Sequence, residues 1–261
     1  LPLATLEGFF KDPAKALLKD HLQLSLDALD DDVRLAEDEP MDVISPIHAV
    51  ARKVFLHHVL PRKCGDPAWT WDRQPPAWVQ FGGLLPLGGA GDAAWAKEAD
   101  AVDALCSQAD ASGRFDARGQ QGGQAVRVDV PLRLPGDAVA AEGVPQRMTG
   151  LLRNVFPLAG SEDGRQVVFA FPSTSDKDDG VKQPEALSFK DRVPAFLQWA
   201  LLRLQRAGTE PPAPVRLTVL AAGEPDFAAQ VNAWDLRYCS RDAAERAAME
   251  ADLRRRLRAL V

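Results

Sequence analysis

The chain has 261 residues, of which 46% are apolar and 26% are charged, and its formal net charge is −6 at pH 7. These values predict a globular fold with a full hydrophobic core, and they exclude a nucleic-acid binder held by a broad positive field. No apolar run reaches the roughly 18 residues that a membrane span needs, and no signal peptide is recognised, so we expect a cytoplasmic protein that contacts no membrane.

Cysteine usage fits a reducing compartment. The three cysteines are Cys64, Cys106 and Cys239. Their odd number and wide spacing suit neither a disulfide framework nor a zinc site, and an iron–sulfur cluster would need four cysteines. We therefore expect no metal and no other cofactor. The chain also starts at Leu1 without a methionine and stops at Val261 in an arginine-rich helix, which predicts a segment of a longer protein.

Two short helices are expected over Leu3 to Leu22, because Asp12 and Pro13 suit the N-cap and first turn of the second helix. The acidic stretch from Ser25 to Pro40 is typical of a solvated linker. A longer helix is expected from Ser45 to Leu60. It carries His48, His57 and His58. These histidines lack the i, i+4 spacing of a helical metal site, so we expect none there.

Aromatic and basic residues then gather in a loop from Cys64 to Pro76. The loop contains Trp69, Trp71 and Arg73. Such a group can stack on unpaired bases, but tryptophans also cover the edges of cores, and both interpretations stay open. The glycine-rich stretch from Gly83 to Gly91 precedes a helix expected over Asp92 to Asp110. It is not a phosphate-binding loop, because no strand precedes it and a Gly-Lys-Ser/Thr sequence is missing.

Three strands are expected next. After a polar surface loop at 112–124, apolar and polar residues alternate from Val126 to Leu134, which predicts a strand with one solvent-exposed face. Two nearly continuous apolar runs at 148–156 and 167–172 flank a turn rich in glycine and aspartate. They predict a hairpin whose strands are covered on both faces. The stretch 173–185 is very polar.

An amphipathic helix is expected from Ser188 or Asp191 to Arg206, because its apolar residues recur at helical spacing. A strand at 215–221 and a last helix from Arg241 to Leu260 complete the chain. Four arginines lie near the end of this helix: Arg254, Arg255, Arg256 and Arg258. They suit the negative end of the helix dipole, and a phosphate contact is the alternative.

Two phrases of the sequence resemble the C-terminal domain of RecC, the gamma subunit of exonuclease V. One is FF-x-x-P-x-x-A-L-L-x-x-x-L, from Phe9 to Leu22, and the more specific one is L-P-x-G-x-x-G, from Leu85 to Gly91. The resemblance implies an α/β (α+β) fold like that of the PD-(D/E)XK nucleases, with a mixed sheet flanked by helices and an N-terminal helical insertion. The expected parts are a helical subregion at 1–110 and the nuclease-like core at 111–261, in one integrated domain.

Helicase-linked nucleases of this fold carry a metal-binding Asp on the first hairpin strand and an acid-x-Lys on the second. When the Gly150 phrase and the second strand are set on these motifs, Arg153 takes the place of the Asp, and Ala170 and Pro172 take those of the acid and the Lys. Metal-assisted hydrolysis needs carboxylate oxygens for Mg²⁺ and a polarised water. These three residues supply neither, so no catalytic residue is expected.

The resemblance therefore implies a non-catalytic domain that guides DNA and supports assembly of the RecBCD helicase–nuclease, with RecB-like and RecD-like subunits and DNA as partners. The candidate DNA contacts are Trp69, Trp71, Arg73, Arg254, Arg255 and Arg258. Two alternatives stay open. One is an active Mg²⁺-dependent nuclease that uses Asp129, Glu162, Asp163 or Asp176. The other is a protein scaffold that makes no DNA contact.

Overall fold

A computed structural model describes residues 1–20, 49–66, 68–86, 88–115, 123–134, 147–173 and 180–260. Its helices are α1 (Leu3–Lys11), α2 (Pro13–Asp20), α4 (Ala49–Val54), η1 (Phe55–Val59), α5 (Leu60–Gly65), α6 (Ala77–Gln80), α7 (Gly89–Ser112), η2 (Pro184–Ala186), α8 (Phe189–Gln205), α9 (Asp226–Cys239) and α10 (Ala243–Arg258). Its strands are β1 (Gln124–Pro131), β2 (Arg147–Pro157), β3 (Arg165–Ala170) and β4 (Val215–Leu220). The acidic stretch 25–40, His48 and parts of the polar stretches 112–124 and 173–185 lie outside the described residues.

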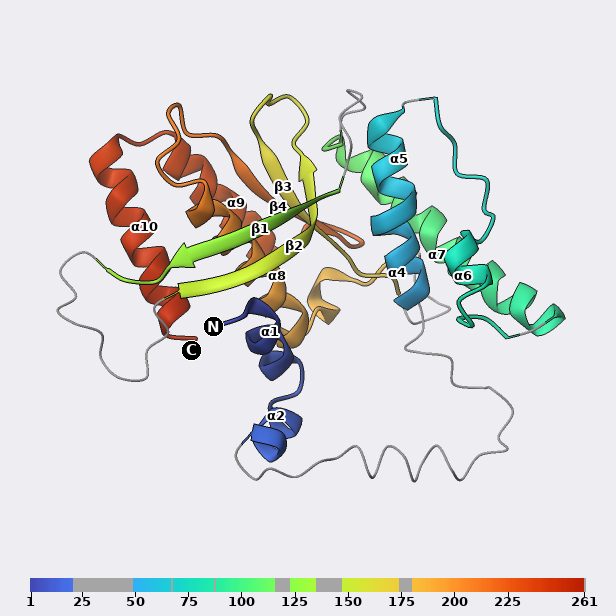
Figure 1. Ribbon diagram of the computed structural model, residues 1–261. Coiled ribbons are helices and arrows are strands. Elements are labelled where there is room, and N and C mark those ends of the chain that lie inside the picture. Colours follow the sequence, from blue (N-terminus) through green and yellow to red (C-terminus); the bar gives the residue numbers. More distant parts are fainter. Residues whose placement is uncertain are drawn as a thin grey trace.

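The strands form one mixed sheet in the order β1-β2-β3-β4 (Figure 1). The pairs β1–β2 and β2–β3 are antiparallel, and β3–β4 is parallel. A parallel neighbour requires a crossover connection, which α8 provides. The predicted α/β class and the predicted order of three strands, a helix and a fourth strand are confirmed.

Helix α8 lies against one face of the sheet and forms the centre of the first core. A capping box starts this helix, with Ser188 and Asp191 each binding the other's backbone. Its apolar stripe is buried, and Trp199 Nε1 donates a hydrogen bond of 2.8 Å to the carbonyl oxygen of Val215. Helices α1 and α10 add Leu3, Leu6, Leu253 and Leu257 to the same core.

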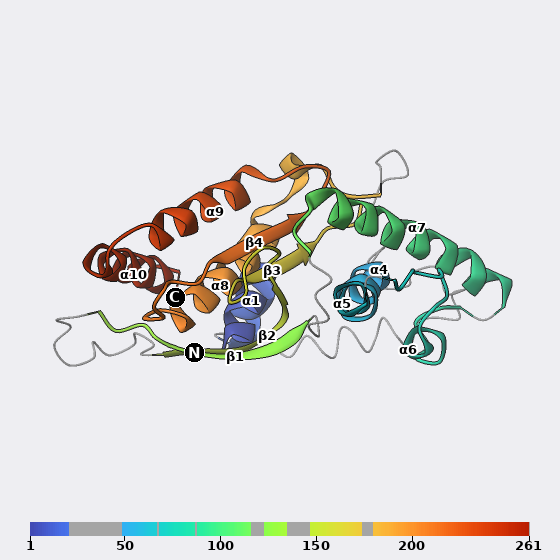
Figure 2. The same ribbon diagram turned by 90° about the horizontal axis from the view of Figure 1, so that it is seen from above.

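A second core lies on the opposite face of β3 and β4. Helices α4, η1, α5 and α7 pack there against Phe156, Val168, Ala170 and Leu220, and Figure 2 shows this helical group beside the sheet. Because Val167 and Phe169 belong to the first core, β3 is buried on both faces, as its nearly continuous apolar run predicts. The same prediction was wrong for the first half of β2, where Leu151 and Arg153 are exposed because no described element packs on that face.

Helix α9 was not predicted. Its apolar residues Phe227, Val231, Trp234 and Tyr238 do recur at helical spacing, and the first three pack, partly buried, against the first core. Polar contacts hold the helix as well: Asn232 Oδ1 accepts a hydrogen bond of 2.9 Å from Leu217 N, and Asp235 Oδ2 accepts one of 2.8 Å from Val215 N. The helix expected to end at Leu60 also continues through α5 to Gly65.

No described helix has the length and apolarity to cross a membrane.

Candidate functional site

The residues at the nuclease positions lie in three different environments. Arg153 is an exposed residue of β2. Ala170 ends β3 and is fully buried in the second core. Pro172 is buried too, and its backbone bridges to Val181. None of these three side chains carries an oxygen that could bind Mg²⁺.

A guanidinium group from the helical subregion lies beside the second of these nuclease strands, next to Ala170 and Pro172. Arg52 of α4 stacks over the ring of Phe171, with 5.6 Å between its guanidinium carbon and the ring centroid. Burial lowers the pKa of Arg52, and the charges of Asp191 and Glu7 act in the opposite direction. The cation therefore lies within electrostatic reach of two carboxylates from different elements.

Both carboxylates also accept hydrogen bonds from other parts of the protein. Glu7 of α1 accepts one of 2.8 Å from Gln198 Nε2, and burial raises the pKa of Glu7. Asp191 Oδ2 accepts hydrogen bonds from the backbone and hydroxyl of Ser188, at 3.2 and 2.9 Å, and lies 3.9 Å from Lys182 Nζ.

The arrangement suits an internal group of opposite charges better than a metal site. Within the described ranges, no group of three or more His, Cys, Asp or Glu side chains could hold a metal ion. The charges of Glu7 in α1 and Asp191 in α8 act on the guanidinium of Arg52 in α4, near the end of β3. Sequence reasoning missed all three. Asp191 carried a signal as the third residue after a helix cap, but no local pattern marks Arg52 or Glu7.

The aromatic residues of the predicted DNA contact pack against the protein. Trp69 and Trp71 are partly buried, and their ring centroids lie 6.5 and 6.3 Å from that of His58 in edge-on geometry. Trp71 also meets Trp95 edge-on at 6.2 Å. Arg73 forms ion pairs with Asp100 and Asp103 of α7. Both tryptophans thus cover the edge of the second core, which is one of the two interpretations that the sequence left open.

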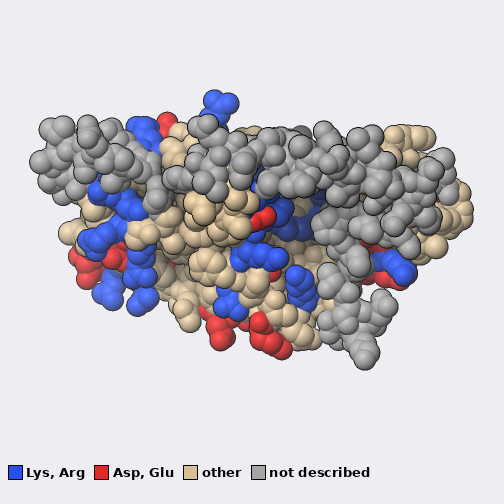
Figure 3. Space-filling model, turned by 90° about the horizontal axis from the view of Figure 1, so that it is seen from below, with Lys and Arg blue, Asp and Glu red and all other residues tan. Residues whose placement is uncertain are grey.

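The predicted arginines of α10 also have acidic neighbours. Arg254 lies 3.5 Å from Glu250, and Arg255 and Arg256 lie 2.9 and 2.8 Å from Asp252. Figure 1 places α10 and the helices α4 to α7 at opposite ends of the molecule, so the two predicted groups of DNA contacts are not brought together. Seen from below, Lys and Arg side chains form one group at the α10 end and another near the middle (Figure 3).

The acids of the alternative active site do not converge. Asp129 is exposed on β1 and accepts a hydrogen bond of 2.8 Å from Arg147 Nε. Glu162 and Asp163 lie in the turn between β2 and β3, and Asp176 lies outside the described residues.

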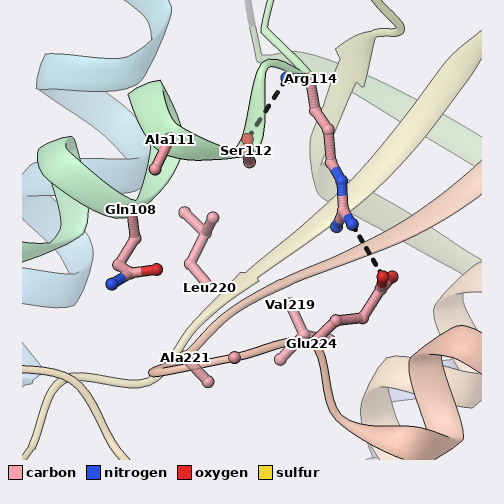
Figure 4. Close-up of a pocket in the computed structure, with 9 residues that line it drawn as sticks. Gln108, Ala111, Ser112, Arg114, Val219, Leu220, Ala221 and Glu224 are labelled. Carbon is pink, nitrogen blue, oxygen red and sulfur yellow. Dashed lines mark hydrogen bonds and ion pairs between the residues drawn. The ribbon is translucent and has the colours of Figure 1, made fainter.

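A pocket of about 170 Å³ lies where the end of α7 meets the end of β4 (Figure 4). It is lined by Gln108, Ala111, Ser112, Arg114, Val219, Leu220, Ala221, Gly223 and Glu224. Arg114 and Glu224 form an ion pair of 2.9 Å at its edge, and Arg216 lies 3.8 Å from the same carboxylate. The nuclease positions do not line it.

The family model described as the RecC C-terminal domain matches residues 1–261, which is the whole chain. A search of curated proteins finds no match.

Proposed function

The chain belongs to the RecC C-terminal domain family, and on this premise we propose that it is a non-catalytic domain of the RecBCD helicase–nuclease that guides DNA and supports assembly. Family membership supports a RecC-related role in that complex. Its proposed partners are the RecB-like and RecD-like subunits and DNA, and its proposed process is repair of double-strand breaks by homologous recombination.

One observation carries the non-catalytic part of the proposal: the nuclease positions hold Arg153, Ala170 and Pro172, and the guanidinium of Arg52 stacks on the neighbouring Phe171. An active site would need carboxylates to bind Mg²⁺ and a water that the metal polarises. Here the charges of Glu7 and Asp191 act on Arg52.

Assembly is supported by the way the two expected parts share cores. Residues of the helical subregion at 1–110 pack against β3 and β4, and α1 packs in the first core with α8. We propose that the subregion and the α/β core act as one unit, so that a partner subunit that binds one part also fixes the other. Contacts of Trp69, Trp71, Arg73, Arg254, Arg255 and Arg258 with DNA stay part of the proposal as secondary contacts.

The first experiment tests whether the chain has nuclease activity. The purified subunit that carries this chain is incubated with single-stranded and duplex DNA in the presence of Mg²⁺ or Mn²⁺. We expect no cleavage. Metal-dependent cleavage that survives further purification and is lost in Asp163→Ala would contradict the proposal and favour the active nuclease.

The second experiment separates a DNA guide from a pure scaffold. Helicase–nuclease complexes are assembled with and without this chain, and subunit composition and DNA unwinding are measured for each. A guide should be needed for unwinding even in those complexes that assemble fully. Failure to assemble without the chain would favour the scaffold instead, and normal assembly and unwinding without the chain would contradict both roles.

A further inference from the structure

One face of the β1–β2 ribbon is positively charged, and no described helix or strand covers it. Successive side chains of a strand point to opposite faces, and here Val128 and Val130 turn into the first core. The residues that alternate with them are exposed, and they include Arg127 and Arg133. Arg153 is exposed further along β2. In Figures 1 and 2 none of the described helices lies over this face of β1 and β2.

The arginines of this face have no acidic partner among the residues that the structure describes. Arg127, Arg133 and Arg153 form no hydrogen bond or ion pair with any of them. The acid nearest to them along β1 is Asp129, and Arg147 already pairs with it at 2.8 Å. Within the described part of the chain, three positive charges therefore have no paired acid, although the net charge of the chain is −6.

The positive surface continues from β2 onto the helical subregion. Lys53 and His57 are exposed one helical turn apart on α4 and η1. Burial lowers the pKa of His57, and the charges of Arg153, Arg52 and Lys53 lower it further. The charges of Arg153, Arg52 and Lys53 therefore all act at His57. No acid of the described residues offsets them there.

We propose that this open face binds single-stranded DNA, with backbone phosphates on Arg127, Arg133, Arg153 and Lys53. The assignment rests on the proposed DNA-guiding function and gives it a surface. A strand of eight residues is about 26 Å long, which is the length of about eight stacked nucleotides at 3.4 Å each. Arginine and lysine are the usual phosphate ligands.

A single strand fits this face better than a duplex because of Leu151. It pairs with Arg127 across the ribbon, lies two residues before Arg153 and is 45% exposed. Bases of a single strand expose their flat faces, and side chains that cover them gain binding energy. A duplex buries those faces in its own stack and could offer Leu151 only backbone or groove edges.

The test compares two double variants of the assembled complex. Arg127→Ala/Arg153→Ala removes two charges from the proposed surface. Arg237→Ala/Arg241→Ala removes two charges from exposed arginines at the end of α9. Binding of a labelled oligothymidylate of about 16 nucleotides, the upper site size of known single-strand binders, is measured by fluorescence anisotropy in EDTA at several salt concentrations. Thermal melts check that all variants are folded.

We expect Arg127→Ala/Arg153→Ala to lower the affinity about twenty-fold at 0.1 M salt and to reduce the salt slope by about 1.4, because each lost phosphate contact removes about 0.7. The α9 pair should stay within about twofold of wild type. Leu151→Ala should weaken the single strand more than a duplex of equal length. An equal fall in both double variants, or no fall in the first, would overturn the site.

The outcomes also separate this site from the broader proposal. If the variant with Arg127→Ala/Arg153→Ala binds and unwinds DNA like wild type, the site is wrong and the guiding function stands. If complexes unwind normally without the whole chain, the guiding function fails as well.

Discussion

Gly150 shows why a motif residue needs to be glycine. It lies in β2 beneath α1, and a Cβ atom at this position would approach Leu3 Cβ to 2.8 Å. Leu3 is buried in the first core, so it has no free space into which to move. The glycine of the sequence Gly150-Leu151-Leu152 is thus required by the close packing of α1 on the sheet. It has no chemical role.

Replacing Gly150 by Ala should therefore lower stability by about 1–3 kcal/mol, the usual cost of overpacking. A matched control is Gly8→Ala in α1, where a Cβ would meet nothing within 4 Å and where alanine favours the helix by about 0.5–1 kcal/mol. Denaturant unfolding measures both. Equal behaviour of the two variants would show that α1 can shift away from β2 without cost.

His57 should make stability depend on pH. Its pKa in the folded chain lies below the ordinary 6.5, because of burial first and of Arg153, Arg52 and Lys53 next. The unfolded chain therefore binds the proton more readily. Stability should be unaffected by this group above pH 6.5, and should fall as the pH drops through 6.5 toward the folded pKa.

The measurement is a comparison of thermal melts for wild type and His57→Gln at pH 7.5 and 5.5. Their difference should move in favour of the variant at the lower pH. His58, whose pKa is also lowered by burial, is common to both proteins and drops out of the comparison. A difference that is the same at both pH values would mean that His57 titrates as in an open chain.

At the level of elements, a buried ion pair connects α8, α9 and the start of β4. Arg203 is fully buried, lies 3.3 Å from Asp235 Oδ1 and donates to the carbonyl oxygen of Ala213 at 2.8 Å. Its guanidinium also stacks on Tyr238 at 4.3 Å. A buried charge that loses its partner costs far more than the pair contributes.

Asp235→Ala should accordingly destabilise the chain by about 3–5 kcal/mol, because it leaves the Arg203 charge buried and unpaired. The double variant Arg203→Leu/Asp235→Leu removes both charges and should be more stable than Asp235→Ala alone. Urea unfolding of the three proteins tests this. A double variant as unstable as the single one would show that the other bonds of Arg203 matter more than its charge.

The elements differ in how far the sequence predicts them. The apolar runs around the 148–172 hairpin and the stripe of α8 face large apolar surfaces, so their patterns gave strands and a helix that the structure confirms. Helix α9 also carries a stripe of apolar residues, Phe227, Val231 and Trp234, which packs partly buried against the first core and is the signal that the prediction missed. The bonds of Asn232 and Asp235 to the backbone of β4 could not be predicted, because side chain to backbone bonds between distant segments leave no periodicity in the sequence.

At the scale of the whole molecule, the candidate site shows the same limit. The three nuclease positions could be found because they lie on one hairpin. The charges of Glu7 in α1 and Asp191 in α8 act on Arg52 in α4, and it is the packing of the helical subregion against the α/β core that brings these three groups near one another. The sequence predicted the basic face of β1 only in part. The alternation from Val126 to Leu134 indicates a solvent-exposed face but does not show what that face binds.

That packing leads to a prediction for the restored motif, Arg153→Asp/Ala170→Asp/Pro172→Lys. Ala170 is 0% exposed and lies in the second core, so an aspartate there would bury a charge among apolar side chains, at a cost of several kcal/mol. We expect the melting temperature to fall by at least about 5 °C and to show no response to Mg²⁺. Arg153→Asp alone is the control, because Arg153 is exposed and its replacement should leave the melt nearly unchanged. A triple variant that melts like wild type and gains stability with Mg²⁺ would instead reveal an open polar pocket, and the place beside Arg52 would then be an emptied metal site that still has room for its ion.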